Sequence, residues 1–169
     1  DLRQSGLFKA YESKIINYDI VPSGLATEII AKALNQAIEL PIVIGIKGEL
    51  GSGKTVFVRS LIRLYKKNEK VKSPTFSLVE EYKYNKIDIT HIDLYRIKKH
   101  EKYYLNYSDY ISENSLIIIE WIENDEKIML KSDIIIELNI IEKKQREIKL
   151  EGKSSKGKKI IQSIKNVSI

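Results

Sequence analysis

The sequence predicts an α/β protein of one domain, with a mixed parallel and antiparallel central sheet flanked by helices. The apolar run 42–46 leads into a glycine-rich turn and then an amphipathic stretch, which is a strand–turn–helix pattern. A second run, 115–121 (SLIIIEW), is almost wholly apolar, as in a parallel strand buried on both faces. Two alternating segments, 76–84 and 87–94, flank Asn85-Lys86 and predict a hairpin, which adds antiparallel pairing to the sheet.

The turn after the first of these strands has the G-x-x-x-x-G-K-T spacing of a phosphate-binding P-loop. Glycine tolerates positive φ, so successive backbone N–H groups can converge on one anion, and the following helix adds its N-terminal amides. The lysine supplies a cation for the β- and γ-phosphates, and the threonine hydroxyl is a hard oxygen ligand for Mg²⁺. The predicted nucleotide-binding residues of this loop are Gly48, Glu49, Leu50, Gly51, Ser52, Gly53, Lys54, Thr55 and Val56.

Two acidic residues lie at positions from which they could bind that Mg²⁺ ion. Glu120 ends the most apolar strand, and Asp93 follows His91 by two positions, so these two share one side of their strand. Either carboxylate could bind Mg²⁺, directly or through water, and either could orient an attacking water, although its position favours Glu120 as the ligand. For His91 alone we expect a half-buried histidine with satisfied hydrogen bonds. For Trp121 we expect core packing, the alternative being a partner surface.

The segment Ser73-Pro74-Thr75-Phe76 lies between the P-loop helix and the next strand. Proline blocks a helix here, and a hydroxyl stands on each side of the rigid bend. Many nucleotide hydrolases keep a loop at this point that senses the γ-phosphate. The alternative is an ordinary turn into the strand 76–84, on which we expect Phe76 and Leu78 to point inward.

The ends of the chain are predicted to lie outside the P-loop domain, which spans 20–151. Residues 1–19 form an extended leader, partly foreign to the natural chain, that ends in a strand near 15–20. The next helix ends before Pro41 and places on one face Leu25, Ile29, Ala33, Leu34, Ala37 and Ile38.

The second half of the chain is predicted to contain a helix at 101–109 and a hairpin of 133–141 with 146–151. Residues 152–169 form a basic tail. Its Lys/Ser/Gly-rich part, 152–159, is expected to be mobile, and a last helix would use Ile160, Ile161, Ile164 and Val167.

Composition narrows the class of protein. The chain has 169 residues, no cysteine and a net charge of +6, and it contains no apolar run of the roughly 18 to 20 residues needed to span a bilayer. A cytoplasmic protein without a membrane segment is therefore expected. The positive charge comes mostly from lysine, 24 of the 29 basic residues, which is more typical of a solvated surface than of a nucleic-acid interface.

Four motifs occur in one order: GELGSGKT at 48–55, SPTFSLVE at 73–80, HIDLYR at 91–96 and IIEW at 118–121. Together they resemble the TsaE (YjeE) family over about 20–151. Members of that family are P-loop ATPases of the bacterial machinery that makes N6-threonylcarbamoyladenosine beside the anticodon of tRNA. The resemblance implies ATP hydrolysis that is slow alone and matters in a complex with TsaD and TsaB, through which tRNA is contacted indirectly.

The resemblance also implies roles for single residues. Lys54 and the loop amides would hold the phosphates of ATP, and Thr55 and Glu120 would hold Mg²⁺, with Asp93 close to the ion or the catalytic water. Thr75 would be the nucleotide-sensing switch, and Gly24 and Arg146 would contact nucleotide.

The sequence departs from the family at Val56, where a second threonine is common, at Ile122, where proline is usual, and at Asn106, where glycine is frequent. Two other functions stay open: a small-molecule kinase, although no arginine-rich lid is visible, and a non-enzymatic nucleotide-binding regulator. No motif specifies an oligomeric state.

Overall fold

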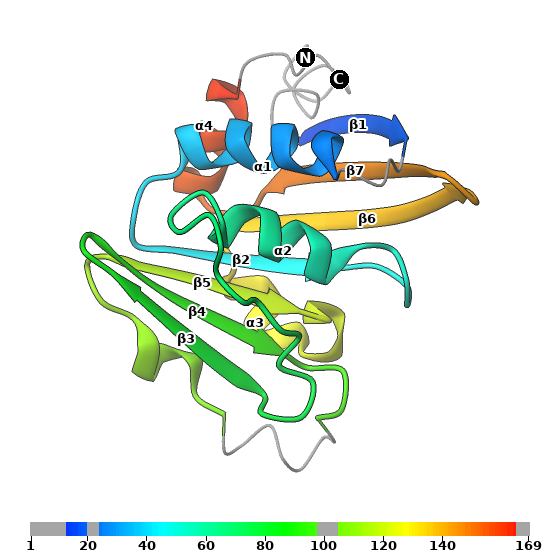
Figure 1. The fold of residues 1–169 in the computed structure, drawn as a ribbon. Helices are drawn as coiled ribbons and strands as arrows, with labels where there is room; N and C mark the ends of the chain where they lie inside the picture. The colour runs from blue at the N-terminus through cyan, green and yellow to red at the C-terminus, as the bar shows by residue number, and fades with distance from the viewer. Residues whose placement is uncertain (1–12, 20–23, 98–104, 165–169) are drawn as a thin grey trace.

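The computed structural model describes residues 13–19, 24–97 and 105–164. Its centre is a seven-stranded sheet with the order β1-β7-β6-β2-β5-β4-β3 (Figure 1). The strands are β1 (Ser13–Asp19), β2 (Ile42–Lys47), β3 (Val79–Tyr84), β4 (Ile87–Asp93), β5 (Ser115–Glu120), β6 (Ile134–Glu142) and β7 (Gln145–Gly152). The helices are α1 (Leu25–Ala37), α2 (Lys54–Ile62), α3 (Glu126–Lys131) and α4 (Ser155–Ser163), with 3-10 turns η3 (Tyr107–Tyr110) and η4 (Ile122–Asn124).

The sheet is mixed, as predicted. β2 pairs in parallel with β5 and β6, and β4 pairs in parallel with β5. The antiparallel pairs are β3 with β4, β6 with β7, and β7 with β1. Parallel strands of one sheet end at the same edge, and the register sets Asp93 at the end of β4 beside Glu120 at the end of β5.

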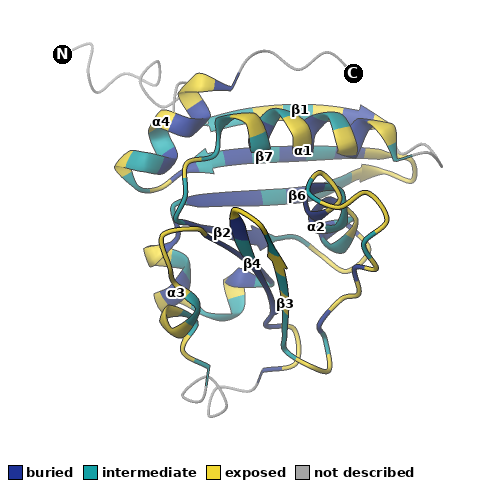
Figure 2. Ribbon diagram, turned by 60° about the vertical axis from the view of Figure 1, so that its left-hand side comes forward, coloured by how far each residue is buried: buried dark blue, intermediate teal, exposed yellow. Residues whose placement is uncertain are grey.

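Two apolar layers enclose the sheet. On one face lie α1, α2 and α4, and their buried side chains pack with those of β2, β4 and β5 in the larger core cluster (Figures 1 and 2). The other face is covered by η4 and α3, whose Ile122 and Ile128 join a smaller cluster. A Cβ added at Gly45 in β2 would lie 2.7 Å from a side-chain carbon of Ile122, so this glycine lets η4 approach the sheet.

The predicted helix before Pro41 is confirmed, but its buried face is rotated. Leu25 is exposed, while Ala26, Ile30, Ala31 and Leu34 are buried. The helix begins after Gly24, whose backbone is left-handed, and it ends where Ile38 becomes extended. A start fixed by this glycine turns the helix so that the Leu25 side chain faces outward.

The first predicted hairpin is confirmed in its turn and wrong at its start. Tyr84 pairs with Ile87 across Asn85-Lys86, but β3 begins only at Val79. Phe76 is 81% exposed, so the expectation that it points inward is wrong. The residues before β3 form a turn closed by Leu78 N–H donating to the Pro74 carbonyl, with Leu78 at φ 67°.

The described part of the segment 101–109 does not form the predicted α-helix. Residues 101–104 lie outside the described part, residues 105–106 are not helical, and only η3 follows, opened by Asn106. One helix was not anticipated: α3, which is capped by the preceding residue, Asp125, whose side chain accepts a hydrogen bond from Ile128 N–H.

The second hairpin, β6 with β7, is confirmed. The last helix is confirmed and contains Ile160 and Ile161. Ile164 is buried but follows the helix in extended backbone, and Val167 lies outside the described residues. The helix begins earlier than predicted, at Ser155, so part of the expected mobile segment is helical. Ser154 starts it by accepting from Gly157 N–H at 2.9 Å.

The strand predicted near 15–20 is β1, which pairs with β7 along its whole length. The division of the chain at residue 20 stays a prediction. Within the described residues, no helix combines the length and the apolar character that a bilayer crossing requires.

Candidate active site

The P-loop joins β2 to α2 at the edge of the sheet where the parallel strands end. Gly48, Gly51 and Gly53 have φ of 149°, 81° and 102°. A Cβ at Gly48 would lie 2.4 Å from the Leu138 carbonyl oxygen, so no larger residue fits there. Gly53 precedes α2, and the first amides of this helix have no carbonyl one turn earlier to bind. The loop and helix start therefore form a cradle of N–H groups suited to an anion.

Lys54 lies inside this loop and is only 5% exposed. Its Nζ donates to the carbonyl oxygens of Gly48 at 2.5 Å and Glu49 at 2.9 Å. Burial lowers the pKa of Lys54, and the nearby carboxylates, Glu120 foremost, oppose that effect. The ammonium group is thus held at the place where a phosphate would meet the loop.

Trp121 covers the lysine. The Nζ atom of Lys54 lies 3.9 Å from the centre of the indole ring, a cation–π contact. Trp121 has a left-handed backbone, φ 57°, where the chain leaves β5 and enters η4, and its ring also packs on Tyr95. The indole is therefore a wall of the site, and the expected role in core packing describes only part of its contacts.

Thr55 and Glu120 meet across the loop. The Thr55 hydroxyl lies 3.1 Å from each carboxylate oxygen of Glu120. Glu120 is 2% exposed and also contacts His91, with Nε2 2.7 Å from Oε1. His91 is fully buried and its Nδ1 has no hydrogen-bond partner, so the expectation of a half-buried, satisfied histidine is wrong.

Asp93 is surrounded by donors from the segment after α2. Its Oδ2 accepts from the hydroxyls of Ser73 at 3.0 Å and Thr75 at 3.1 Å, and its Oδ1 accepts from Tyr95 N–H at 2.8 Å. The hydroxyls of Ser73 and Thr75 also lie 2.8 Å apart. Ser73 thus contacts Asp93 as Thr75 does, although only Thr75 was predicted to have a role; the signal in the sequence was the hydroxyl on each side of Pro74.

A cleft of about 510 Å³ opens over these groups. It is lined by residues 50–51 and 53–56 of the loop and the start of α2, by Thr75 and Asp93, and by Glu120 and Trp121. The structure therefore brings together the residues predicted for phosphate and metal binding, although they come from the P-loop, the segment after α2 and the ends of two strands.

Gly24 and Arg146 lie on the other side of the P-loop. Both line a cavity of about 150 Å³ that also contacts Gly51 and Gly53. Arg146 is 8% exposed, and its guanidinium donates to the carbonyl of Glu142 at 3.0 Å and to that of Gly51 at 3.4 Å. The arginine thus ties the β6–β7 turn to the P-loop.

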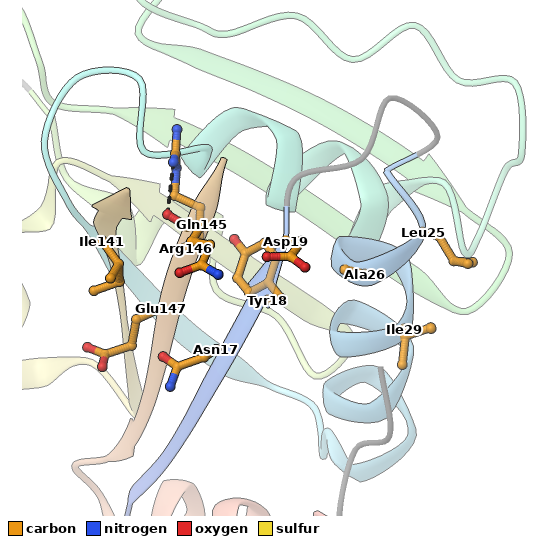
Figure 3. A pocket seen from close by; sticks show the side chains of 10 residues that line it. All are labelled: Asn17, Tyr18, Asp19, Leu25, Ala26, Ile29, Ile141, Gln145, Arg146 and Glu147. Atoms are coloured by element: carbon orange, nitrogen blue, oxygen red, sulfur yellow. Dashed lines mark hydrogen bonds between the residues drawn. The ribbon is translucent and has the colours of Figure 1, made fainter. Parts of the chain in front are cut away.

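A larger cavity of about 640 Å³ adjoins this one and shares Tyr18, Asp19 and Arg146 with it. Figure 3 shows these side chains on the ends of β1 and β7, beside the first turn of α1, which carries Ala26. The two cavities together extend from the P-loop to the start of α1.

The donor set fits a magnesium nucleotide better than a free metal ion. Within the described residues, no group of three or more His, Cys, Asp or Glu side chains is arranged to hold a metal. Nucleotide-bound Mg²⁺ takes few protein ligands, usually a hydroxyl and one or two carboxylates, because phosphate and water supply the rest. Thr55 and Glu120 provide that combination beside the lysine.

Comparisons with known proteins agree with this geometry. Residues 21–148 match the family described as "Threonylcarbamoyl adenosine biosynthesis protein TsaE". The TsaE protein of Aquifex aeolicus is 37% identical over 133 residues, which cover 78% of this chain and 92% of that protein. The TsaE protein of Haemophilus influenzae is 34% identical over 129 residues, which cover 76% of this chain and 81% of that protein.

The fold is also found in a solved structure. The crystal structure of Bacillus subtilis YdiB superposes with a TM-score of 0.71 at 21% identity, covering 90% of this chain and 95% of that one. At this identity the likeness concerns the fold alone. The family match, the two relatives and the P-loop geometry together show that this chain belongs to the TsaE family.

Proposed function

We propose that this chain is a Mg²⁺-dependent ATPase, slow on its own, that is required for threonylcarbamoylation of adenosine next to the anticodon of tRNA in the cytoplasm. The relatives named tRNA threonylcarbamoyladenosine biosynthesis protein TsaE support the pathway. The observation that supports the activity best is that Lys54, Thr55 and Glu120 line one cleft at the end of the sheet, because ATP hydrolysis needs a cation at the phosphates and ligands for Mg²⁺.

In this proposal the loop amides and Lys54 bind the β- and γ-phosphates. To reach them, the ammonium group exchanges the carbonyls of Gly48 and Glu49 for phosphate oxygens. Thr55 and Glu120 would hold Mg²⁺, which when bound neutralises charge that develops on the phosphates. Glu120 is the better direct ligand, because its carboxylate contacts one hydroxyl and one ring nitrogen, whereas three donors surround Asp93.

Asp93 would act on the segment that carries Ser73 and Thr75. Three donors already occupy its two oxygens, so its first role is to hold that segment beside the phosphate site. A γ-phosphate could then compete with Asp93 for the Thr75 hydroxyl. This exchange is the physical basis on which we propose Thr75 as the switch.

The sugar and base of ATP would extend past Gly51 into the cavity lined by Gly24 and Arg146. The cavity offers Tyr18 and Ala26 as apolar walls and Asp19 and Thr27 as polar groups. Its place directly beside the P-loop supports this assignment.

The partners in this proposal are TsaD and TsaB, with tRNA reached through them. Apolar side chains are exposed around the mouth of the phosphate cleft, namely Leu50, Val56, Phe76 and Tyr95. Arg96 packs over the Phe76 ring at 4.2 Å. An exposed apolar rim of this kind favours contact with another protein at the place where the nucleotide is bound.

The test is ATP hydrolysis in the presence of Mg²⁺, with and without the TsaD–TsaB pair. We expect slow phosphate release from the chain alone and faster release in the complex. Lys54→Ala should abolish both, whereas Lys83→Ala, an exposed lysine on β3, should change neither. Full turnover by Lys54→Ala would refute the proposal, and a phosphorylated small-molecule product would indicate a kinase instead.

A further inference from the structure

His91 lies behind the phosphate site, on the face of the sheet that α2 covers. It belongs to β4, where Ile87, Ile89, His91 and Asp93 alternate onto one face, and it pairs in register with Ile118 of β5. The neighbouring isoleucines belong to the larger apolar cluster. A fully buried imidazole at this boundary between the apolar core and the site needs a specific partner.

That partner is Glu120. The His91 Nε2 atom lies 2.7 Å from Glu120 Oε1, and both side chains are almost completely buried. Thr55 approaches the same carboxylate from α2, with its hydroxyl 3.1 Å from Oε1 and from Oε2. Glu120 is therefore held from two directions, by a hydroxyl on the helix and by an imidazole on the adjacent strand.

The unpartnered Nδ1 atom indicates which tautomer the ring adopts. A lone pair on Nε2 would repel the carboxylate, so Nε2 carries the hydrogen and donates it to Oε1. A second hydrogen on Nδ1 would be buried without an acceptor, which costs more than an unused lone pair. The neutral ring with its proton on Nε2 is the form that these contacts accommodate.

We propose that His91 is a positioning residue for the magnesium ligand. By donating Nε2–H to Oε1, it holds the Glu120 carboxylate against Thr55, so that the remaining lone pairs face the cleft. This inference rests on the magnesium site of the proposed function and does not depend on TsaD, TsaB or tRNA. Hydrogen bonds of this kind orient metal ligands and tune their affinity for the ion.

The experiment measures ADP binding by the isolated full chain, by calorimetry, with and without Mg²⁺. The variants are His91→Gln, whose amide nitrogen reaches about as far as Nε2, His91→Asn, whose amide stops at the place of Nδ1, and His91→Leu. We expect His91→Leu and His91→Asn to need at least about tenfold more Mg²⁺ for half-maximal enhancement of ADP affinity. His91→Gln should stay close to the wild type, and Mg²⁺-free ADP affinity should be unchanged in all three.

If His91→Leu fails to fold, the comparison of His91→Gln with His91→Asn still decides the test. Both side chains end in an amide, but only that of Gln is long enough to reach the place of Nε2. Equal Mg²⁺ dependence in His91→Gln and His91→Asn, whether normal or weakened, would overturn the proposal and leave His91 as a packing residue. Wild-type ADP binding that ignores Mg²⁺ would also overturn it. Failure of TsaD–TsaB to stimulate hydrolysis would instead count against the proposed function alone.

Discussion

The Thr55 hydroxyl lies 3.1 Å from both carboxylate oxygens of Glu120, so the first turn of α2 is hydrogen-bonded to the last residue of β5. These residues are 65 positions apart in the chain. Their contact depends on parallel pairing of β2 with β5, which brings the P-loop and the end of SLIIIE to one edge of the sheet.

Glu120→Gln should separate nucleotide binding from metal binding. The amide keeps the size of the side chain but loses its charge, so Mg²⁺ would bind more weakly while the P-loop amides still hold ADP. We expect ATP hydrolysis to fall by about a hundredfold, with Mg²⁺-free ADP affinity nearly unchanged. Glu113→Gln, an exposed acid just before β5, is the matched control. Normal hydrolysis by Glu120→Gln would exclude this carboxylate as the ligand.

Thr75→Val should impair hydrolysis more than binding. The substitution removes one of the two hydroxyls that donate to Asp93 Oδ2 and keeps the shape of the side chain. We expect turnover of ATP to fall about tenfold, whereas ADP affinity changes little, because ADP lacks the phosphate that Thr75 would sense. Steady-state rates and calorimetry would measure both. An equal loss in Ser73→Ala would show that holding Asp93, and no switch at Thr75, is what matters.

Trp121 should report nucleotide binding by its fluorescence. It is the only tryptophan of the chain, and the Lys54 ammonium lies 3.9 Å from its ring centre. Phosphate would draw the ammonium away from the indole and change the emission. We expect a saturable change on titration with ADP in the wild type and in Lys83→Ala, and none in Lys54→Met. Binding seen by calorimetry without any change in emission would contradict the expected movement of Lys54.

Gly157→Ala should destabilise the fold without touching the site. A Cβ at this helix position would lie 1.8 Å from the Asp133 carbonyl oxygen, a contact that only a shift of α4 can relieve. We expect a loss of about 2–3 kcal/mol in the free energy of unfolding, measured by urea denaturation. Lys159→Ala, exposed on the same helix, should leave stability almost unchanged. A neutral Gly157→Ala would mean that α4 packs less closely than described.

The contribution of the Tyr84–Glu69 hydrogen bond should depend on pH. The Tyr84 hydroxyl donates to the Glu69 carboxylate at 2.8 Å, and this bond, opposed by partial burial, lowers the pKa of Glu69 below 4.5. A carboxyl whose pKa is depressed on folding adds stability above its unfolded pKa and loses it as the pH falls through the folded pKa. Tyr84→Phe should therefore be less stable than the wild type near neutral pH, and this difference should shrink below pH 4.5. A difference that does not vary with pH would contradict this.

Local patterns in the sequence predict the P-loop, its strand and helix, and both hairpins, because each depends on the order of neighbouring residues. The position of Glu120 was predictable for the same reason, since a wholly apolar strand ends there. The rotated face of α1 was not, because Gly24 fixes where that helix starts and apolar counting alone does not show it. Phe76 was misplaced because the turn closed by Leu78 and Pro74 interrupts the apparent alternation.

Contacts between strands could not be predicted from spacing. The register of β4 against β5 places Asp93 beside Glu120, and the same register brings His91 within reach of Glu120. The Lys54–Trp121 contact likewise requires the left-handed turn at Trp121, which is unusual for a bulky residue. Such contacts depend on tertiary packing, which the sequence pattern does not show. For this reason His91 was expected to have all its hydrogen bonds satisfied, although its Nδ1 has no partner.

The absence of a side chain at Gly45 affects the Lys54–Trp121 contact described above. Ile122 sits where a side chain at position 45 would be, and Trp121 is its direct neighbour in the chain. A methyl group added there would push Ile122 outward and carry the indole with it. The place of the Trp121 ring over the Lys54 ammonium therefore depends in part on the absence of a side chain at Gly45.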